Sequence, residues 1–512
     1  MPMSSCSARR PSTTGHDRPR RAILRAAWLW LLIGICGLVI AAPAAGQTGE
    51  ELAARRFESG LVFVRDGNFR EALEDFQAVA NLYPESAVAD NAILEIARYH
   101  LEVSGAVDQA AAAADRIVNN QSYSQGDAAP EAYVVLGRAA LARSLTEGDI
   151  QDAVSNFQRG LRLYPDSSAV SQTLFYIAEG SRLAGQPAEA LAGYRRVLAE
   201  HPGDPWAIRA RLGAGRMAVL MNDPISAMEE FQRVRDESGD GPEAADALAR
   251  TTILYRLFVR PPETAYAIEP SADAGGRTTR KVVALAPLPD GNVVVATDRA
   301  VSSLRPSPLP ASERPRALAV GPDGPVVVNE RGVLQRVNGE SVRFVVPDRD
   351  DARTLNEVDA LVATSTGDWL VADRQAETIQ RFSRTGIYIG EYADVRAERL
   401  AIDPLDRVAV LDNDDGLHVY DAGRQIARLS TRVDNLYRID NPADVAFDAF
   451  GHLYVLDREG VYIFSRDRRF MMRVPASDDA PNAFDRATAM AIDPAGRLYV
   501  ADERDKIVFV LQ

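Results

Sequence analysis

Residues 491–502 read Ala-Ile-Asp-Pro-Ala-Gly-Arg-Leu-Tyr-Val-Ala-Asp, and versions of this phrase decide the fold of the second half of the chain. Apolar alternation at period two, with Gly or Asp-Pro at the turns, is typical of antiparallel hairpins. Six units, spaced about 33 to 45 residues apart, predict a six-bladed β-propeller over residues 281–512. Each copy places a Val four residues after its turn residue, and these turn residues are Gly291, Gly324, Gly367, Asp406, Gly451 and Gly496.

The phrase in residues 491–502 resembles the NHL repeat, and the resemblance implies a closed ring of blades. The chain ends at Gln512, directly after the third strand of the sixth blade. We therefore expect residues 264–269, from Thr264 to Glu269, to supply the missing outer strand and to remove an exposed sheet edge. Prolines follow blade one, which we expect to lack its outer strand, at Pro306, Pro308, Pro310 and Pro315.

Residues 51–258 repeat a different pattern, in which an aromatic residue follows an Ala at the fourth position. Steps of three and four place such residues on one helical face, and a proline after each copy stops the helix. The pattern resembles tetratricopeptide repeats, and its Tyr-Pro ending is similar to that of bacterial cell-envelope proteins. The copies are Ala72 with Phe76, Ala153 with Phe157, Ala190 with Tyr194, and Ala227 with Phe231.

The repeat count gives five helical hairpins and a capping helix near residues 241–257. Against the family spacing, residues 144–150 lengthen the turn of the third hairpin by about four residues. Residues 259–280 contain Pro and Gly and predict a linker. The predicted fold class is multidomain α and β, with an N-terminal α-solenoid of tetratricopeptide-like hairpins followed by a six-bladed β-propeller.

The tetratricopeptide resemblance implies a concave groove, lined by the first helix of each hairpin, that takes a helix or an extended peptide. The alternative reading of the same positions is a set of solvated helix faces. The family's groove positions correspond here to Phe175, Glu179, Arg182, Arg209 and Arg216.

The first 46 residues have the composition of a signal peptide. Six arginines precede an apolar run at residues 26–42, and small residues follow it at Ala42, Ala44 and Ala45. We expect export and cleavage near Ala45, which places the protein in the periplasm or outside the cell. An uncleaved membrane anchor is the alternative, and the export route, general secretory or twin-arginine, stays open.

Charge and cysteine content exclude several classes of protein. The chain has 512 residues and a net charge of −14, which argues against a nucleic-acid surface because phosphate binding needs a basic face. Its two cysteines, Cys6 and Cys36, both lie in the leader. The mature protein is therefore predicted to have neither disulfides nor thiolate chemistry.

No convergent catalytic set stands out in the sequence, and we predict no catalytic residue, metal or cofactor. Four aspartates recur two residues after the shared Val, at Asp373, Asp412, Asp457 and Asp502, and we expect the same turn-stabilising hydrogen bonds in each blade. Polar residues before the inner strands rim the mouth of the propeller channel, either as a ligand surface or as ordinary loop charge; they are Arg316, Asp359, Glu398, Arg399, Asp444 and Thr488.

These observations predict a non-enzymatic scaffold of the cell envelope. Other envelope proteins or peptides would bind in the solenoid groove and on the loop face of the propeller, with no nucleic acid involved. The alternative is a propeller hydrolase or lactonase with a metal in the central channel.

Overall fold

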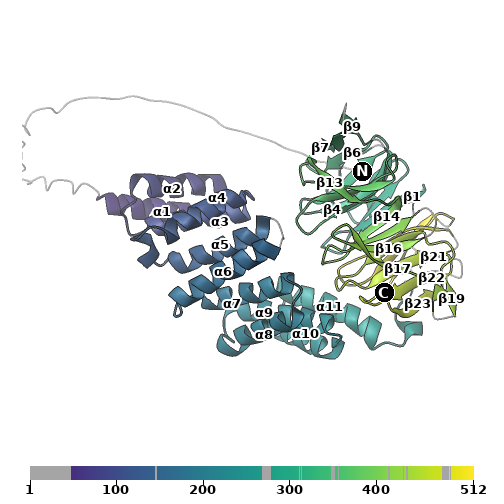
Figure 1. The fold of residues 1–512 in the computed structure, drawn as a ribbon, viewed down its shortest axis with the longest axis horizontal. Coiled ribbons are helices and arrows are strands. Elements are labelled where there is room, and N and C mark those ends of the chain that lie inside the picture. The colour runs from purple at the N-terminus through teal and green to yellow at the C-terminus, as the bar shows by residue number, and fades with distance from the viewer. Residues whose placement is uncertain are drawn as a thin grey trace, which may run out of the picture.

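The protein consists of a curved helical solenoid followed by a ring of β-sheets, as the computed structural model in Figure 1 shows. The structure describes residues 48–143, 147–267, 278, 280–310, 312, 314–347, 352–355, 357–412, 416–430, 432–433, 436–475, 484, 486–504 and 506–512. The predicted signal peptide therefore lies outside the described residues.

Eleven α-helices in the described residues form five hairpins and a final single helix, which confirms the repeat count. First helices of neighbouring hairpins contact one another, α3 with α5, α5 with α7 and α7 with α9, and so form one layer of the solenoid. The helices are α1 Gly49–Arg65, α2 Phe69–Leu82, α3 Ala89–Glu102, α4 Val107–Val118, α5 Ala129–Arg143, α6 Glu147–Leu163, α7 Val170–Leu183, α8 Pro187–Glu200, α9 Pro205–Leu220, α10 Pro224–Ser238 and α11 Pro242–Phe258, with a short 3₁₀ turn η1 at Tyr123–Gln125.

In the first, third and fifth hairpins an aromatic ring of the second helix packs against a glycine of the first helix. A Cβ on Gly215 would lie 2.6 Å from the ring of Phe231, and one on Gly137 would lie 2.2 Å from Phe157. Both aromatic side chains are fully buried, as the sequence pattern predicts.

The prediction for the third hairpin is wrong in one respect. Residues 147–150 continue helix α6, which starts at Glu147 and runs to Leu163, so only residues 144–146 separate it from α5. The extra residues therefore lengthen the second helix rather than the turn, because Ile150 packs into the core with the apolar face of α6.

The second half forms six antiparallel sheets arranged around an axis, which confirms the six-bladed propeller. Their innermost strands contact one another in the cyclic order β1, β4, β10, β14, β20 and β24, and β24 returns to β1. The blades are β1 Val282–Pro287, β2 Val293–Thr297 and β3 Val301–Ser303; β4 Pro315–Gly321, β5 Gly324–Asn329, β6 Val333–Arg336 and β7 Ser341–Arg343; β10 Val358–Ala363, β11 Trp369–Asp373, β12 Thr378–Phe382 and β13 Tyr388–Ala393; β14 Ala397–Ile402, β15 Val408–Asp412, β16 Leu417–Asp421 and β17 Arg424–Leu429; β20 Asp444–Phe447, β21 Leu453–Asp457, β22 Gly460–Phe464 and β23 Phe470–Pro475; and β24 Ala487–Ile492, β25 Leu498–Asp502 and β26 Ile507–Leu511.

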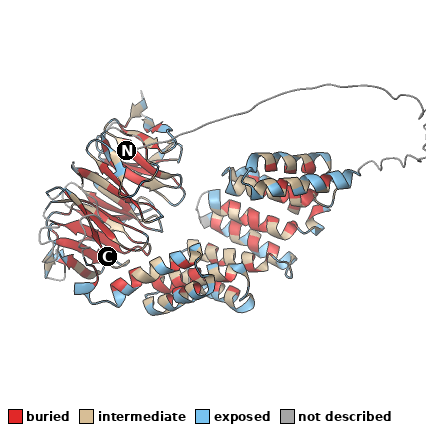
Figure 2. Ribbon diagram, turned by 180° about the vertical axis from the view of Figure 1, so that it is seen from behind, coloured by how far each residue is buried: buried red, intermediate tan, exposed pale blue. Residues whose placement is uncertain are grey.

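Two small ribbons lie between blades, β8 Val345–Pro347 with β9 Ala352–Thr354, and β18 Arg432–Val433 with β19 Tyr437–Arg438. In the described residues blade one has three strands, as its prolines predict. The shared Val of every blade lies in the core, at 0% to 2% exposure. Figure 2 shows buried residues in red along many strands of the propeller.

The ring closes between its last strand and the chain before blade one. Ala267 and Gln512 exchange two backbone hydrogen bonds of 3.0 Å, and the amide of Thr278 donates to the carbonyl of Lys506 at 2.8 Å. The predicted pairing is thus present at Ala267. Thr264, however, belongs to a 3₁₀ turn, η2 Pro262–Thr264, and Glu269 lies outside the described residues.

The recurrent aspartates stabilise turns, although not identically. Asp373 and Asp502 accept a hydrogen bond from the amide two residues on, Gln375 at 3.1 Å and Arg504 at 2.8 Å. Asp412 accepts instead from Gly416 at 2.6 Å, four residues on. One carboxylate position therefore serves turns with different hydrogen-bond geometry.

The solenoid is fused to the propeller through a shared hydrophobic core. Phe231 of α10 lies 6.2 Å from Phe450, ring centre to ring centre, and both belong to a cluster that extends into blades five and six. The buried Arg256 of α11 donates hydrogen bonds to the carbonyls of Ala495 at 3.3 Å and Gly496 at 2.5 Å. The docking surface is therefore made by the turns at residues 448–452 and 493–497, between the inner and second strands of these two blades.

The segment predicted as a linker also takes part in this junction. The ring of Tyr266 lies under the guanidinium of Arg256 at 4.9 Å, and its hydroxyl lies 3.2 Å from that of Tyr454 in blade five. Burial raises the pKa of Tyr266 to about 12 and the pKa of Tyr454 well above its ordinary value. Residues 261–267 therefore brace the two domains together.

Candidate binding surfaces

Three surfaces of the described structure are candidates for ligand binding: the layer of first helices, a cleft between the two domains, and the mouth of the propeller channel. The docked turns lie at the ends of the inner strands, whereas the channel-mouth residues lie at their starts. The inner strands contain four to seven residues and rise about 3.3 Å per residue. The start and the end of each strand therefore lie on opposite faces of the propeller, and the channel mouth lies on the face away from the solenoid.

The predicted groove residues lie in the first-helix layer, around a cluster of aromatic rings. The ring centre of Phe175 lies 5.1 Å from Trp206 and 5.8 Å from Tyr194. Tyr176 extends the cluster, 5.4 Å from Trp206. The guanidinium of Arg209 lies over Trp206 at 4.7 Å, a distance suited to cation–π attraction.

The other three groove residues are held by charge partners. Arg182 donates to Glu179 at 2.8 Å, and the same carboxylate accepts a hydrogen bond from the hydroxyl of Tyr194. Burial, together with Glu179, raises the pKa of Tyr194. This hydroxyl is therefore a fixed donor that orients Glu179.

Arg216 pairs with Asp246 of α11 at 3.2 Å, and Arg250 donates to the same carboxylate at 2.9 Å. Burial opposes ionisation of Asp246, but the two arginines hold its pKa below the ordinary value. Among the described residues, Arg209 is the one predicted groove cation without an ion pair inside 4.0 Å.

Three groove residues were missed by sequence reasoning: Tyr176, Trp206 and Arg138. Arg138 lies over the ring of Tyr176 at 5.5 Å and pairs with Glu102 at 2.7 Å. A signal for Trp206 was available, because Asp204-Pro205 marks a helix start and places the next residue in its first turn.

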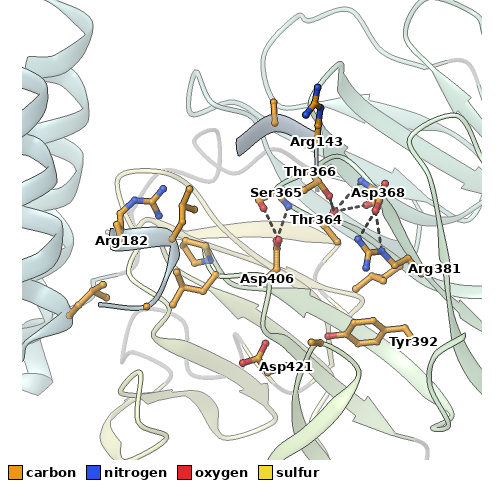
Figure 3. A pocket seen from close by; sticks show the side chains of 18 of the residues that line it. Arg143, Arg182, Thr364, Ser365, Thr366, Asp368, Arg381, Tyr392, Asp406 and Asp421 are labelled. Atoms are coloured by element: carbon orange, nitrogen blue, oxygen red, sulfur yellow. Dashed lines mark hydrogen bonds and ion pairs between the residues drawn. The ribbon is translucent and has the colours of Figure 1, made fainter. Parts of the chain in front are cut away.

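The interdomain cleft has a volume of about 670 Å³ and is walled by both domains. The C-terminal ends of α5, α7 and α9 supply one wall, where Arg143 and Arg182 extend from the solenoid (Figure 3). Arg182 belongs to the groove as well, so the groove and the cleft meet at this side chain. Turns and strands of blades three, four and five supply the facing wall, including Thr364, Ser365, Asp368, Arg381, Asp406, Asp421 and Arg466.

Most charged groups of the cleft are already paired. Arg381 donates to Asp368 at 2.7 Å, and Asp406 accepts from the amide of Ser365 at 2.7 Å and from its hydroxyl at 2.6 Å. Both interactions appear as dashed lines in Figure 3. The cleft is therefore polar on its propeller side, with Leu183, Pro187 and Leu220 on the solenoid side.

The channel mouth is a cavity of about 390 Å³ on the opposite face. Arg374, which the sequence did not single out, donates to Asp359 at 2.8 Å, while Arg316 has no carboxylate within 4.0 Å in the described part of the chain. The predicted mouth residues that line the cavity are Arg316, Asp359, Glu398, Arg399 and Thr488.

Asp444 lies just behind this lining, with its carboxylate 3.9 Å from the buried Nε of Arg399. It accepts backbone hydrogen bonds from Val445 at 2.9 Å and from Met490 at 2.8 Å. Burial raises the pKa of Asp444, and the charge of Arg399 only partly offsets this. The arrangement places one weakly ionising acid beside one guanidinium.

A metal site needs several ligand side chains that converge on one point, whatever the local net charge. In the described ranges no group of three or more His, Asp or Glu side chains is placed to hold a metal ion. The two propeller histidines serve turns instead, His452 with Asp448 at 2.7 Å and His418 with Asp412 at 3.0 Å.

These features define the class of the protein: tetratricopeptide repeats joined to a six-bladed β-propeller. Residues 56–86 and 172–204 match the tetratricopeptide repeat family. No curated protein matches the chain. None of the helices within the described ranges has the length and apolar content required to span a membrane.

Solved structures resemble each half separately. A thermophilic tetratricopeptide protein of Thermus thermophilus has 17% identity and a TM-score of 0.33, over 39% of this chain and 98% of that one. A gluconolactonase of Xanthomonas campestris has 15% identity and a TM-score of 0.35, over 49% of this chain and 98% of that one. A streptogramin B lyase has 10% identity and a TM-score of 0.36, over 49% and 99%.

Proposed function

We propose that this protein is an exported, non-enzymatic scaffold of the cell envelope that holds two partners at once. One partner binds along the first helices of the solenoid as a helix or an extended peptide, and the other binds at the channel mouth of the propeller. Tetratricopeptide repeats support the first part, because their stacked hairpins present an extended binding surface.

The observation that carries the proposal is the mode of docking. The last hairpin and α11 contact the turns of blades five and six. This contact buries neither Arg209 in the groove nor Arg316 at the channel mouth. Both side chains are exposed. A rigid junction with two free, oppositely placed surfaces is what a bridging protein requires.

Matched charge reversals test the two surfaces separately. We expect R209E to reduce capture of one partner from envelope extracts, and R316E to reduce capture of a different one. Arg196, exposed on the second helix α8, and Arg428, exposed on the outer strand β17, give the controls R196E and R428E. Equal capture by all four variants would refute the two-surface scaffold.

Export is tested independently by fractionating cells and sequencing the N-terminus of the mature protein. A chain starting near residue 46 in the envelope fraction supports cleavage, and a chain retaining its first residues in the membrane supports the anchor. Recovery of the protein only in the cytoplasm would contradict the proposed location in the cell envelope.

The alternative, a metal-dependent hydrolase or lactonase, receives no specific support from the described residues, since they assemble no metal-ligand group. Elemental analysis of the purified protein tests it directly. One chelatable Ca²⁺ per chain, whose removal lowers stability, would favour the hydrolase over the scaffold.

A further inference from the structure

Three arginines lie close together where blades four and five meet, and one of them, Arg466, lines the interdomain cleft. Arg407 follows the inner turn of blade four, and Arg466 and Arg468 lie on the turn between β22 and β23 of blade five. Arg407 Nη2 lies beside Gly451, and Arg468 Nη1 donates to the carbonyl of the same Gly451 at 3.3 Å. Two guanidiniums thus approach one another at this glycine, and Arg466 lines the cleft beside them.

The available negative charge is already committed. Asp403, whose side chain is fully buried, accepts from Arg407 at 2.6 Å and from the amides of Leu405 and Arg407 at 2.9 Å each. Across the described ranges, neither Arg466 nor Arg468 has a carboxylate oxygen within 4.0 Å. Asp467, between them, is exposed. The neighbouring cleft carboxylate Asp406 is bonded to Ser365.

Two further observations indicate excess positive charge at this cluster, where the guanidinium of Arg468 also lies over the ring of Phe447 at 5.2 Å. The buried Nη2 of Arg468 has no hydrogen-bond partner in the described structure. Burial and the nearby charge of Arg407 lower the pKa of Arg468 to about 10 and lower the pKa of Arg466. Like charges held together in a partly buried place are destabilising unless a counter-charge joins them.

Arg468 has an evident structural role, whereas no hydrogen bond or ion pair of Arg466 is seen within the described ranges. In blade one, Arg305 donates to the carbonyl of the turn glycine Gly291 at 2.7 Å, as Arg468 does to Gly451. The interaction recurs, and in each case it joins two turns of the same blade. Arg466 makes no such bond and faces the cleft, where a ligand can reach it.

We propose that Arg466 and Arg468 form an oxyanion-binding site at the blade-five edge of the interdomain cleft, with Arg407, bound to Asp403, adding positive charge beside them. Its ligand is a carboxylate or phosphate group, because a planar guanidinium donates two parallel hydrogen bonds to either. The group belongs to a small molecule or to an acidic side chain entering the cleft. The site goes beyond the proposed scaffold function and does not depend on it.

The test measures the thermal unfolding midpoint of the purified protein against increasing inorganic phosphate or hexaglutamate peptide, with sodium chloride at matched ionic strength. We expect at least one oxyanion to raise the midpoint more than chloride does, because ligands that bind the native state stabilise it. Phosphate alone, or hexaglutamate alone, identifies the preferred source of the oxyanion.

The variant R466Q separates binding from stability. We expect it to weaken oxyanion binding about tenfold, the effect of one lost charge-assisted hydrogen bond. Without oxyanion, its midpoint should equal or exceed that of the parent, since a like charge has been removed. Arg469, exposed on the same turn, gives the control R469Q, which should bind as the parent does.

Several results would overturn the site. These are equal protection by chloride, parental oxyanion binding by R466Q, or equal weakening by R469Q. Loss of partner capture with oxyanion binding intact would instead count against the scaffold alone, so the two proposals fail separately.

Discussion

Gly496 is the turn residue of blade six and the point where α11 presses on the propeller. Its φ is +73°, and a Cβ there would lie 2.6 Å from Cγ1 of Ile253 and 3.3 Å from Nη1 of Arg256. Ile253 is fully buried, so it has no open space into which to move. We therefore predict that G496A weakens the junction as well as the turn.

The magnitude follows from two separate costs. An alanine in the left-handed region costs about 1–2 kcal/mol relative to glycine, and overpacking a filled site costs about 1–3 kcal/mol more. Gly367 is the matched control, since it is the turn residue of blade three, at φ +87°, with Pro322 Cγ at 3.2 Å and no solenoid atom among its nearest neighbours. We expect G496A to cost about 1–3 kcal/mol more than G367A.

The assay uses one tryptophan in each domain. Without the leader the chain keeps only Trp206 in α9 and Trp369 in β11. W206F therefore leaves a reporter of the propeller, and W369F leaves a reporter of the solenoid. In urea, each variant is compared with its own single-tryptophan parent, and G496A should separate two transitions that coincide in the parent.

The result that would refute this reasoning is equal destabilisation by G496A and G367A, with both reporters still unfolding together. That outcome would mean that the free-energy cost of placing alanine in a left-handed backbone conformation accounts for the destabilisation of both variants. The contact between Ile253 and Gly496 would then not couple the domains.

Three further predictions concern the same junction and the groove. Stability should fall as pH rises through about 10 to 12, because the pKa of Tyr266 is raised to about 12 and its neutral form is favoured in the folded state; Y266F should reduce this loss in alkaline urea titrations. F231A should cost about 3–5 kcal/mol, because its fully buried ring contacts both Gly215 and Phe450, and it should shift both tryptophan transitions. R211A should cost stability without altering partner capture, because Arg211 pairs with Glu230 and Glu237 of the neighbouring helix; reduced capture would show that the groove extends to this side of α9.

The parts of the fold that repeat were predictable because each repeat solves the same local problem. The aromatic ring at Phe157 and Phe231 must fill the space left by a glycine one helix earlier, so its spacing reveals the hairpin. The shared Val of each blade is buried in the same sheet position. Because these local requirements recur along the chain, the repeated pattern can be recognised within a single sequence.

The junction could not be predicted, because its contacts are made only once and over long separations. Arg256 and Gly496 are 240 residues apart. Phe231 fits the repeat pattern as well as Phe157 does, and nothing in its spacing shows that it also packs on Phe450. The linker prediction for residues 259–280 missed Tyr266 for the same reason, since its buried hydroxyl is explained only by Tyr454 in a distant blade.

The groove shows a related limit of family positions. The structure brings two of them, Phe175 and Arg209, into one aromatic cluster, but family positions do not show that Glu179 and Arg182 are paired with each other. Pairing decides what remains available to a ligand, because an arginine already bonded to a carboxylate must break that bond to bind another.

Anion binding by this chain therefore depends on which arginines of the repeats are left without a carboxylate partner in the described structure. In blades four and six the inner-turn aspartates, Asp403 and Asp493, bind an arginine four residues on, Arg407 and Arg497, and are thereby neutralised. Blade five adds Arg466 beside the pair of Asp403 and Arg407, at the cleft between the propeller and the docked solenoid. The repeats form the rigid frame, and Arg466 at their junction supplies the positive charge that would attract an anionic ligand into the cleft.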